Sequence, residues 1–204
     1  MAKFGFRETY IRLAGALNTA QDIMVRERGS VEWPWFVLNV CDSEICLERL
    51  GLLKADFSRF FWYLIARQWA DFDTIPHDRL AAEFKKHRAG WEPEIMTWGH
   101  PKGTDNLKTY KSLPDSVTAY RGQRFDQPVG LSWTLDLEVA ARYAFGHRDG
   151  RNPDRVIFSR AVAKKDIALV VNEREEAELV LFAAPKRDSC DVVTYDDEGL
   201  VGAR

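Results

Sequence analysis

The stretch EAELVLF, residues 176–182, joins two closely spaced carboxylates to an apolar run. A short run of branched and aromatic residues is typical of a buried strand. Strand side chains alternate between the two faces, so we expect Glu176 and Glu178 to lie on the same side of a sheet. The alternative is a solvated hairpin tip, since Glu173 and Glu175 make the whole segment rich in glutamate.

Two shorter motifs precede this stretch, YRG at residues 120–122 and SWT at residues 132–134. The guanidinium of Arg121 offers a rigid fork of donors that suits phosphate or carboxylate. On a strand, the two hydroxyls of the second motif point to one face and the indole of Trp133 to the other. Each motif also has a structural interpretation: a strand-end arginine in a salt bridge, and a strand that runs into a helix N-cap at Thr134.

An arginine, a hydroxyl pair and paired glutamates, in this order, supply the groups needed to hold a pyrophosphate and to cleave a glycosidic bond. Breaking such a bond develops an oxocarbenium-like cation on the sugar. Fixed negative charge stabilises that cation. A carboxylate at the start of a buried strand is held rigidly, which makes Glu178 the candidate for this task.

The ordered set resembles the Arg…Ser-x-Thr…Glu-x-Glu signature of the ADP-ribosyltransferases, which transfer ADP-ribose from NAD. The resemblance covers residues 115–184 approximately. It implies an α+β chain, with a split β-sandwich that takes NAD as its substrate, and no metal. In the family an apolar strand directly follows the catalytic glutamate, which here makes Glu178 catalytic and places Glu176 beside the acceptor.

The same resemblance assigns the remaining site residues. Arg121 supports the phosphates and ribose of NAD, and Gly122 lets the backbone approach the ligand. Ser132 orients the catalytic glutamate, and with Trp133 and Thr134 it belongs to the NAD-binding set. The helix expected over residues 137–145 brings Tyr143 to the nicotinamide ring, although a core tyrosine is an equal alternative.

The function implied is mono-ADP-ribosylation of a macromolecule, by a protein similar to bacterial or phage toxins and host-modifying effectors. A neutralising antitoxin partner is expected to accompany such a toxin. A Glu-x-Glu motif accompanies transfer to arginine in the family, so a protein side chain is narrowly favoured over an RNA or DNA base. A non-catalytic binding module on the same fold is the competing class.

The loop at residues 146–153 resembles one that covers NAD or contacts the acceptor, with Arg148 or Arg151 reaching a phosphate. A plain exposed loop has the same composition.

The sequence pattern changes from helix-periodic to strand-like along the chain. It divides the chain into a mostly helical lobe, residues 1–110, and an NAD-binding catalytic core, residues 111–204. Apolar periodicity predicts helices over residues 6–28, 53–69 and 78–87, whereas residues 34–50 fit either a strand or a buried helix. Glycine and proline predict a loop-rich connection over residues 90–114. Strands are expected over residues 117–121, 156–162, 167–171, 178–184 and 191–195.

Composition restricts the class further. The 204 residues are 46% hydrophobic with a net charge of −2, and no apolar run is long enough for a membrane span or a secretory segment. The three cysteines lack a CxxC pair and the four histidines lack metal spacing. We therefore expect a cytoplasmic protein. The basic run at residues 85–88, near Trp91 and Trp98, fits either a helix end or a single-stranded nucleic-acid contact.

Overall fold

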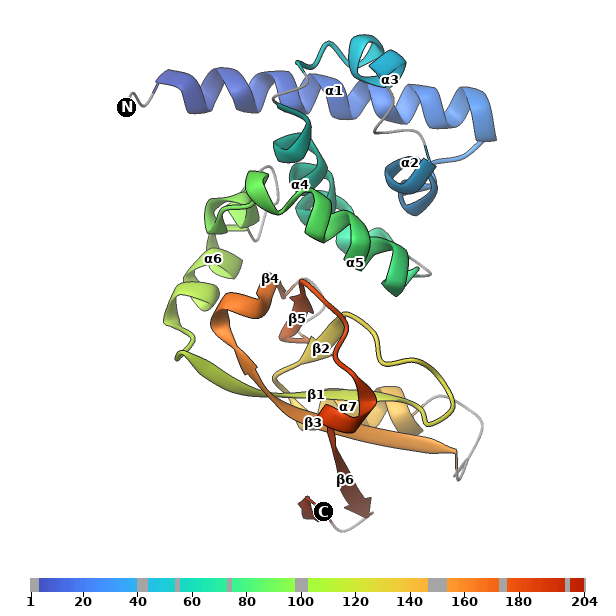
Figure 1. Cartoon of the computed structure of the whole chain (residues 1–204), viewed down its shortest axis with the longest axis vertical. Helices are drawn as coiled ribbons and strands as arrows, with labels where there is room; N and C mark the ends of the chain where they lie inside the picture. Colours follow the sequence, from blue (N-terminus) through green and yellow to red (C-terminus); the bar gives the residue numbers. More distant parts are fainter. Residues whose placement is uncertain are drawn as a thin grey trace. The chain divides into compact units, whose positions relative to one another are not determined.

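The computed structural model describes residues 4–39, 44–53, 56–72, 75–97, 103–146, 154–172, 176–196 and 199–203. The chain divides into two compact units, Met1–Thr104 and Asp105–Arg204. The first is helical over its described residues and the second contains the sheet (Figure 1). This combination of helices with an antiparallel sheet confirms the predicted α+β class.

Helices account for the described residues of the predicted helical half, and two of them cover most of the described part of the ambiguous segment at residues 34–50. The helix α4 is buried around most of its circumference, which makes it the centre of this unit rather than the one-sided helix predicted. Leu53, assigned to its apolar face, is 64% exposed. The bounds are α1 (Phe4–Arg28), α2 (Trp33–Asn39), α3 (Glu44–Arg49), α4 (Phe57–Gln68) and α5 (His77–Lys86), with short 3-10 turns at Trp69–Asp71, Arg88–Gly90 and Pro93–Thr97.

The basic run at residues 85–88 is interrupted by a buried histidine. His87 stacks on the ring of Phe61 at a centroid distance of 4.5 Å, and its Nδ1 lies 3.1 Å from the hydroxyl of Ser58. Burial lowers the pKa of His87 to about 4, so the ring is neutral at neutral pH. The guanidinium of Arg88 lies over the ring of Trp91, and Trp98 lies outside the described residues.

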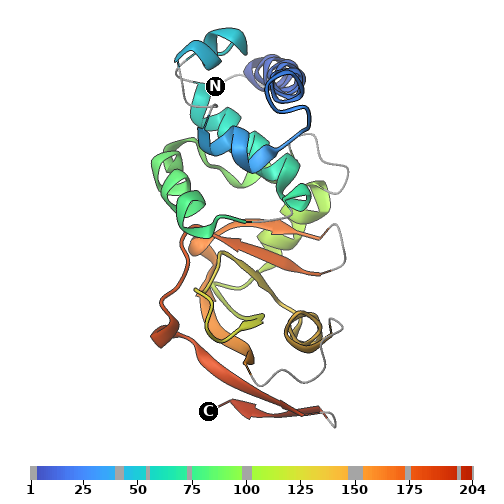
Figure 2. The same cartoon turned by 90° about the vertical axis from the view of Figure 1, so that its right-hand side faces the viewer.

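In the part of the chain that the structure describes, seven strands form one sheet in the order β4-β5-β2-β1-β3-β6-β7. Every neighbouring pair is antiparallel. One such pair, β6 and β7, leads to the C-terminus (Figure 2). All five residues of β4 are buried, as its unbroken apolar sequence predicts. The bounds are β1 (Ser116–Arg124), β2 (Ser132–Thr134), β3 (Arg155–Ala163), β4 (Ile167–Val171), β5 (Glu178–Leu181), β6 (Asp191–Asp196) and β7 (Gly199–Ala203).

The helix α7 (Leu137–Phe145) has the predicted bounds, and its N-cap is Asp136. The Asp136 carboxylate accepts hydrogen bonds from the backbone amides of Glu138 and Val139, at 2.8 and 3.4 Å. Thr134, which the sequence offered as an N-cap, is not the cap, because its hydroxyl donates to the carbonyl oxygen of Glu176.

Close packing of α7 on β1 depends on Gly122. A Cβ atom at this position would overlap the carbonyl oxygen of Ala140 and lie 2.6 Å from the amide nitrogen of Ala144. Both alanines are buried. The small residues of α7 and the missing side chain at Gly122 together allow the backbone of the helix to approach the strand.

Two elements were not predicted, the helix α6 (Gly103–Ser112) and the strand β7. The helix lies within the segment expected to be a loop-rich connection. Among the described residues, none of the helices has the length and apolar character that crossing a membrane requires.

Candidate functional site

The sheet brings Ser132 of β2 next to Glu178 of β5. The two strands pair antiparallel, with Thr134 opposite Glu178 and Ser132 opposite Val180, so Ser132 and Glu178 are diagonal neighbours on one face. The Ser132 hydroxyl donates a 2.5 Å hydrogen bond to Glu178 Oε1. Glu178 is half-buried at the first position of a strand whose other residues are buried. The structure therefore joins the serine and the glutamate that the sequence assigned to one site.

Arg121 joins the same site from β1. Its Nη1 donates to the carbonyl oxygen of Ser132 at 2.5 Å, and its Nε donates to Gln123 Oε1 at 2.6 Å. The register of β1 with β2 pairs Tyr120 with Thr134, and the guanidinium adds a further link between these strands. Burial lowers the pKa of Arg121 to about 10, while the charge of Glu178 acts in the opposite direction. The arginine is therefore a cation at neutral pH, electrostatically coupled to the glutamate.

Glu176 is held differently from Glu178. The strand β5 begins at Glu178. The residue before it, Ala177, has a φ of +44°, in the left-handed region that residues other than glycine rarely adopt. The period-two argument that placed both carboxylates on one face therefore does not apply across Ala177. Glu176 Oε1 accepts a 2.8 Å hydrogen bond from the hydroxyl of Tyr143. The two carboxylates thus have separate partners, one on β2 and one on α7.

The turn that carries both glutamates is fixed by side chains from two other segments. The hydroxyl of Thr134 donates to the carbonyl oxygen of Glu176 at 2.5 Å and accepts from the amide of Asp136 at 3.0 Å. The amide of Ala177 donates to Asn172 Oδ1 at 3.3 Å. Thr134 is buried. Its hydroxyl positions the glutamate turn rather than facing a ligand.

Two residues assigned to NAD binding pack within the sheet unit. The indole of Trp133 is 2% exposed, and its Nε1 donates to the carbonyl oxygen of Gly130. Gly122 faces the backbone of α7, which accounts for the absence of a side chain there. Tyr143, by contrast, is 45% exposed, so the alternative of a core tyrosine is wrong. Its ring lies at the surface with the hydroxyl on Glu176.

Several sequence-based assignments lie outside the described residues. These are the alternative glutamates Glu173 and Glu175, and the loop arginines Arg148 and Arg151. Within the described ranges, no group of three or more His, Cys, Asp and Glu side chains is arranged to hold a metal ion.

Gln123 is the site residue that sequence reasoning missed. It is 4% exposed, on the same strand as Arg121 and two residues beyond it. Period-two alternation places residues i and i+2 of a strand on one face, so a polar residue at position 123 is a signal that could have been used.

Comparison with known proteins gives no relative for this arrangement: no protein-family model matches the chain, and neither the curated proteins nor the solved structures contain a significant match.

Proposed function

We propose that this chain is a mono-ADP-ribosyltransferase with the split β-sandwich of that family, and that it acts as a toxin or host-modifying effector. Its substrate is NAD and its acceptor is a macromolecule. The observation that carries the proposal is the hydrogen bond from Ser132 to Glu178, with the half-buried guanidinium of Arg121 on the carbonyl of that same serine. Ser132 contacts both groups, since its carbonyl accepts from the arginine and its hydroxyl donates to the glutamate, and a plain salt bridge would not require these contacts.

The chemistry follows from the charges. A guanidinium matches the geometry of phosphate oxygens, so Arg121 is suited to the diphosphate of NAD. The ribose–nicotinamide bond breaks with its electron pair leaving on the nicotinamide nitrogen, and positive charge develops at the sugar. Glu178 supplies negative charge for that cation without having to reorganise, because strand pairing and the Ser132 hydroxyl already hold it in place.

Glu176 is suited to the second half of the reaction. Attack of an acceptor nitrogen or oxygen on the ribose carbon releases a proton, and a carboxylate beside the acceptor can take it. Tyr143 holds one oxygen of this carboxylate from the exposed end of α7. We favour an arginine side chain of a protein as acceptor. The alternative acceptor is a nucleobase of RNA or DNA, with Glu176 again as the general base.

Calorimetric titration with NAD tests the proposal. Removal of charge-assisted hydrogen bonds costs about 1.5–3 kcal/mol, so Arg121→Ala is expected to weaken NAD binding roughly 10-fold or more. Arg124→Ala is the matched control, because Arg124 is on the same strand but is exposed and paired with Asp126. The control is expected to bind like the wild type. Absence of heat from the wild type at millimolar NAD would favour the non-catalytic module instead.

Glu176→Gln is expected to separate hydrolysis from transfer. The amide keeps the shape of the side chain and removes the base, so nicotinamide release continues while labelling of the acceptor from labelled NAD falls about 100-fold. Glu138→Gln, a charge removal at the exposed start of α7, is expected to retain both activities. Transfer by Glu176→Gln at the wild-type rate would remove Glu176 from the acceptor side.

The same labelling in a cell lysate identifies the acceptor class. Label that survives nuclease and leaves the macromolecular fraction on protease treatment indicates protein. Label with the opposite sensitivity would contradict the preference for an arginine side chain and favour a nucleic-acid base.

A further inference from the structure

Gln123 is a buried amide whose two ends face opposite kinds of partner. Its Oε1 accepts from Nε of Arg121, and its Nε2 donates to the carbonyl oxygen of Gln127 at 2.9 Å. The carbonyl oxygens of Arg124 and Pro128 lie 3.2 and 3.4 Å from the same nitrogen. A flipped amide would point its NH₂ at a guanidinium and its oxygen at three carbonyls, so this one orientation is favoured.

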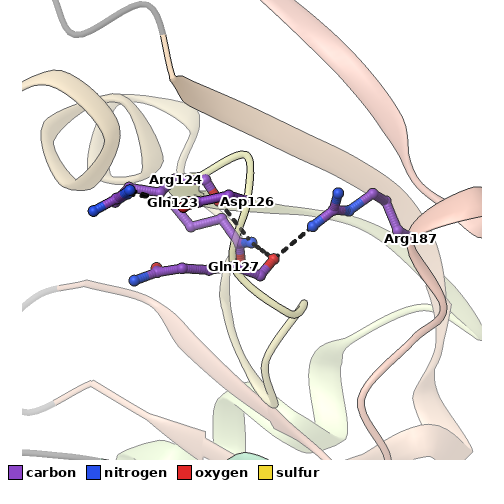
Figure 3. Close-up of polar contacts among 5 residues, drawn as sticks. All are labelled: Gln123, Arg124, Asp126, Gln127 and Arg187. Carbon is purple, nitrogen blue, oxygen red and sulfur yellow. Dashed lines mark hydrogen bonds and ion pairs between the residues drawn. The ribbon is translucent and has the colours of Figure 1, made fainter.

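The loop that Gln123 holds is also fixed by Arg187, a residue distant in the sequence that lies between β5 and β6. Arg187 donates from Nη2 to the carbonyl oxygen of Gln127 at 2.7 Å, and its guanidinium lies 4.8 Å from the ring centroid of Phe125. Figure 3 shows Gln123 and Arg187 meeting at this one carbonyl. The loop after β1 is therefore anchored on both sides, and its position is transmitted to Arg121 through a single buried amide.

A neutral partner suits an arginine that binds an anion. A guanidinium has five N–H groups, and among the described residues Arg121 uses one for Gln123 and one for Ser132. Within the described ranges, no hydrogen bond to the protein occupies the other three. Glu178 already acts on the charge of Arg121. A second carboxylate in place of the amide would orient the guanidinium equally well, but it would compete further with a phosphate.

We propose that Gln123 is a positioning residue for NAD: it fixes the guanidinium of Arg121 for the diphosphate and adds no further negative charge beside it. This inference rests on the proposed function. It predicts an effect on the binding of NAD rather than on the bond-breaking step, because the diphosphate is held equally in the ground state and in the transition state.

Gln123→Met and Gln123→Glu test this proposal from two directions. Methionine keeps the volume and removes both hydrogen bonds, and the KM and Kd for NAD are expected to rise about 10-fold. The kcat of nicotinamide release is expected to stay within about 3-fold of the wild type. Gln123→Glu keeps an acceptor for Arg121, yet it is also expected to weaken NAD binding. Gln127→Ala is the matched control, because Gln127 contributes its backbone carbonyl to this network, and it is expected to behave as wild type.

A second measurement keeps the two proposals separable. The Nε–H resonance of Arg121, assigned by its loss in Arg121→Lys, reports the contact with Gln123 without NAD. It is expected to shift and to exchange faster with solvent in Gln123→Met. An unchanged resonance, or an unchanged Kd beside a fallen kcat, would overturn the assignment of Gln123. If the wild type neither binds nor cleaves NAD, the proposed function fails, and with it the use of Gln123 for NAD, whatever the resonance shows.

Discussion

Glu178→Gln is expected to slow the release of nicotinamide from NAD by about 100-fold or more, the usual cost of removing a positioned electrostatic group. The amide oxygen of glutamine can still accept the hydrogen bond from Ser132, and the strand pairing of residue 178 involves only its backbone. The substitution therefore removes charge from the site and little else. Nicotinamide released at saturating NAD, measured by chromatography, gives the rate directly.

The control for this prediction is Glu138→Gln, which removes the same charge from the exposed start of α7. Its rate is expected to match the wild type, and both variants are expected to remain folded. If Glu178→Gln releases nicotinamide at the wild-type rate, Glu178 is not the stabilising carboxylate and the proposed site is wrong.

Gly122→Ala is expected to destabilise the sheet unit by about 3 kcal/mol, at the upper end of the usual cost of overpacking. The added methyl group meets backbone atoms of α7, the carbonyl of Ala140 and the amide of Ala144, and not the movable end of a side chain. The helix must therefore shift off β1 as a whole. Urea unfolding, combined with hydrogen exchange of the peptides from β1 and β3, measures the loss in this unit separately from the helical one.

Thr118→Ala is the control on the same strand. Thr118 is exposed, and such surface changes usually stay within about 0.5 kcal/mol. An equal unfolding midpoint for Gly122→Ala and Thr118→Ala would show that α7 does not depend on the missing side chain.

Local sequence patterns predicted those elements whose pattern is complete within the element itself. The bounds of α7 follow from an N-cap residue and the small apolar residues after it. The bounds of β4 follow from an unbroken apolar run. The helix α6 has a mostly polar sequence that follows a segment rich in glycine and proline, so periodicity could not reveal it. The strand β7 has two glycines in five residues, and its partner is β6, which a one-dimensional pattern does not show.

The site shows the same limit at the level of single residues. Alternation along β2 correctly separated Trp133 from the two hydroxyls. It could not show that Thr134 binds the glutamate turn while Ser132 binds the glutamate itself, because that depends on the positive φ of Ala177. Nor could it show that the position where a Cβ atom of residue 122 would lie faces the helix α7. The sequence alone thus identifies candidate residues, and their partners depend on the three-dimensional contacts.

The link from Arg121 to the carbonyl of Ser132 has a consequence for sequence comparison. Because this arginine also joins two strands of the sheet, selection for a folded protein would retain it in descendants that no longer act on NAD. Glu178 contributes its side chain to the proposed chemistry, and its backbone pairing can be kept by other residue types. Under the proposed function, a homologue with an arginine at position 121 need share only the fold, whereas one that also has a glutamate at position 178 is expected to have kept the activity.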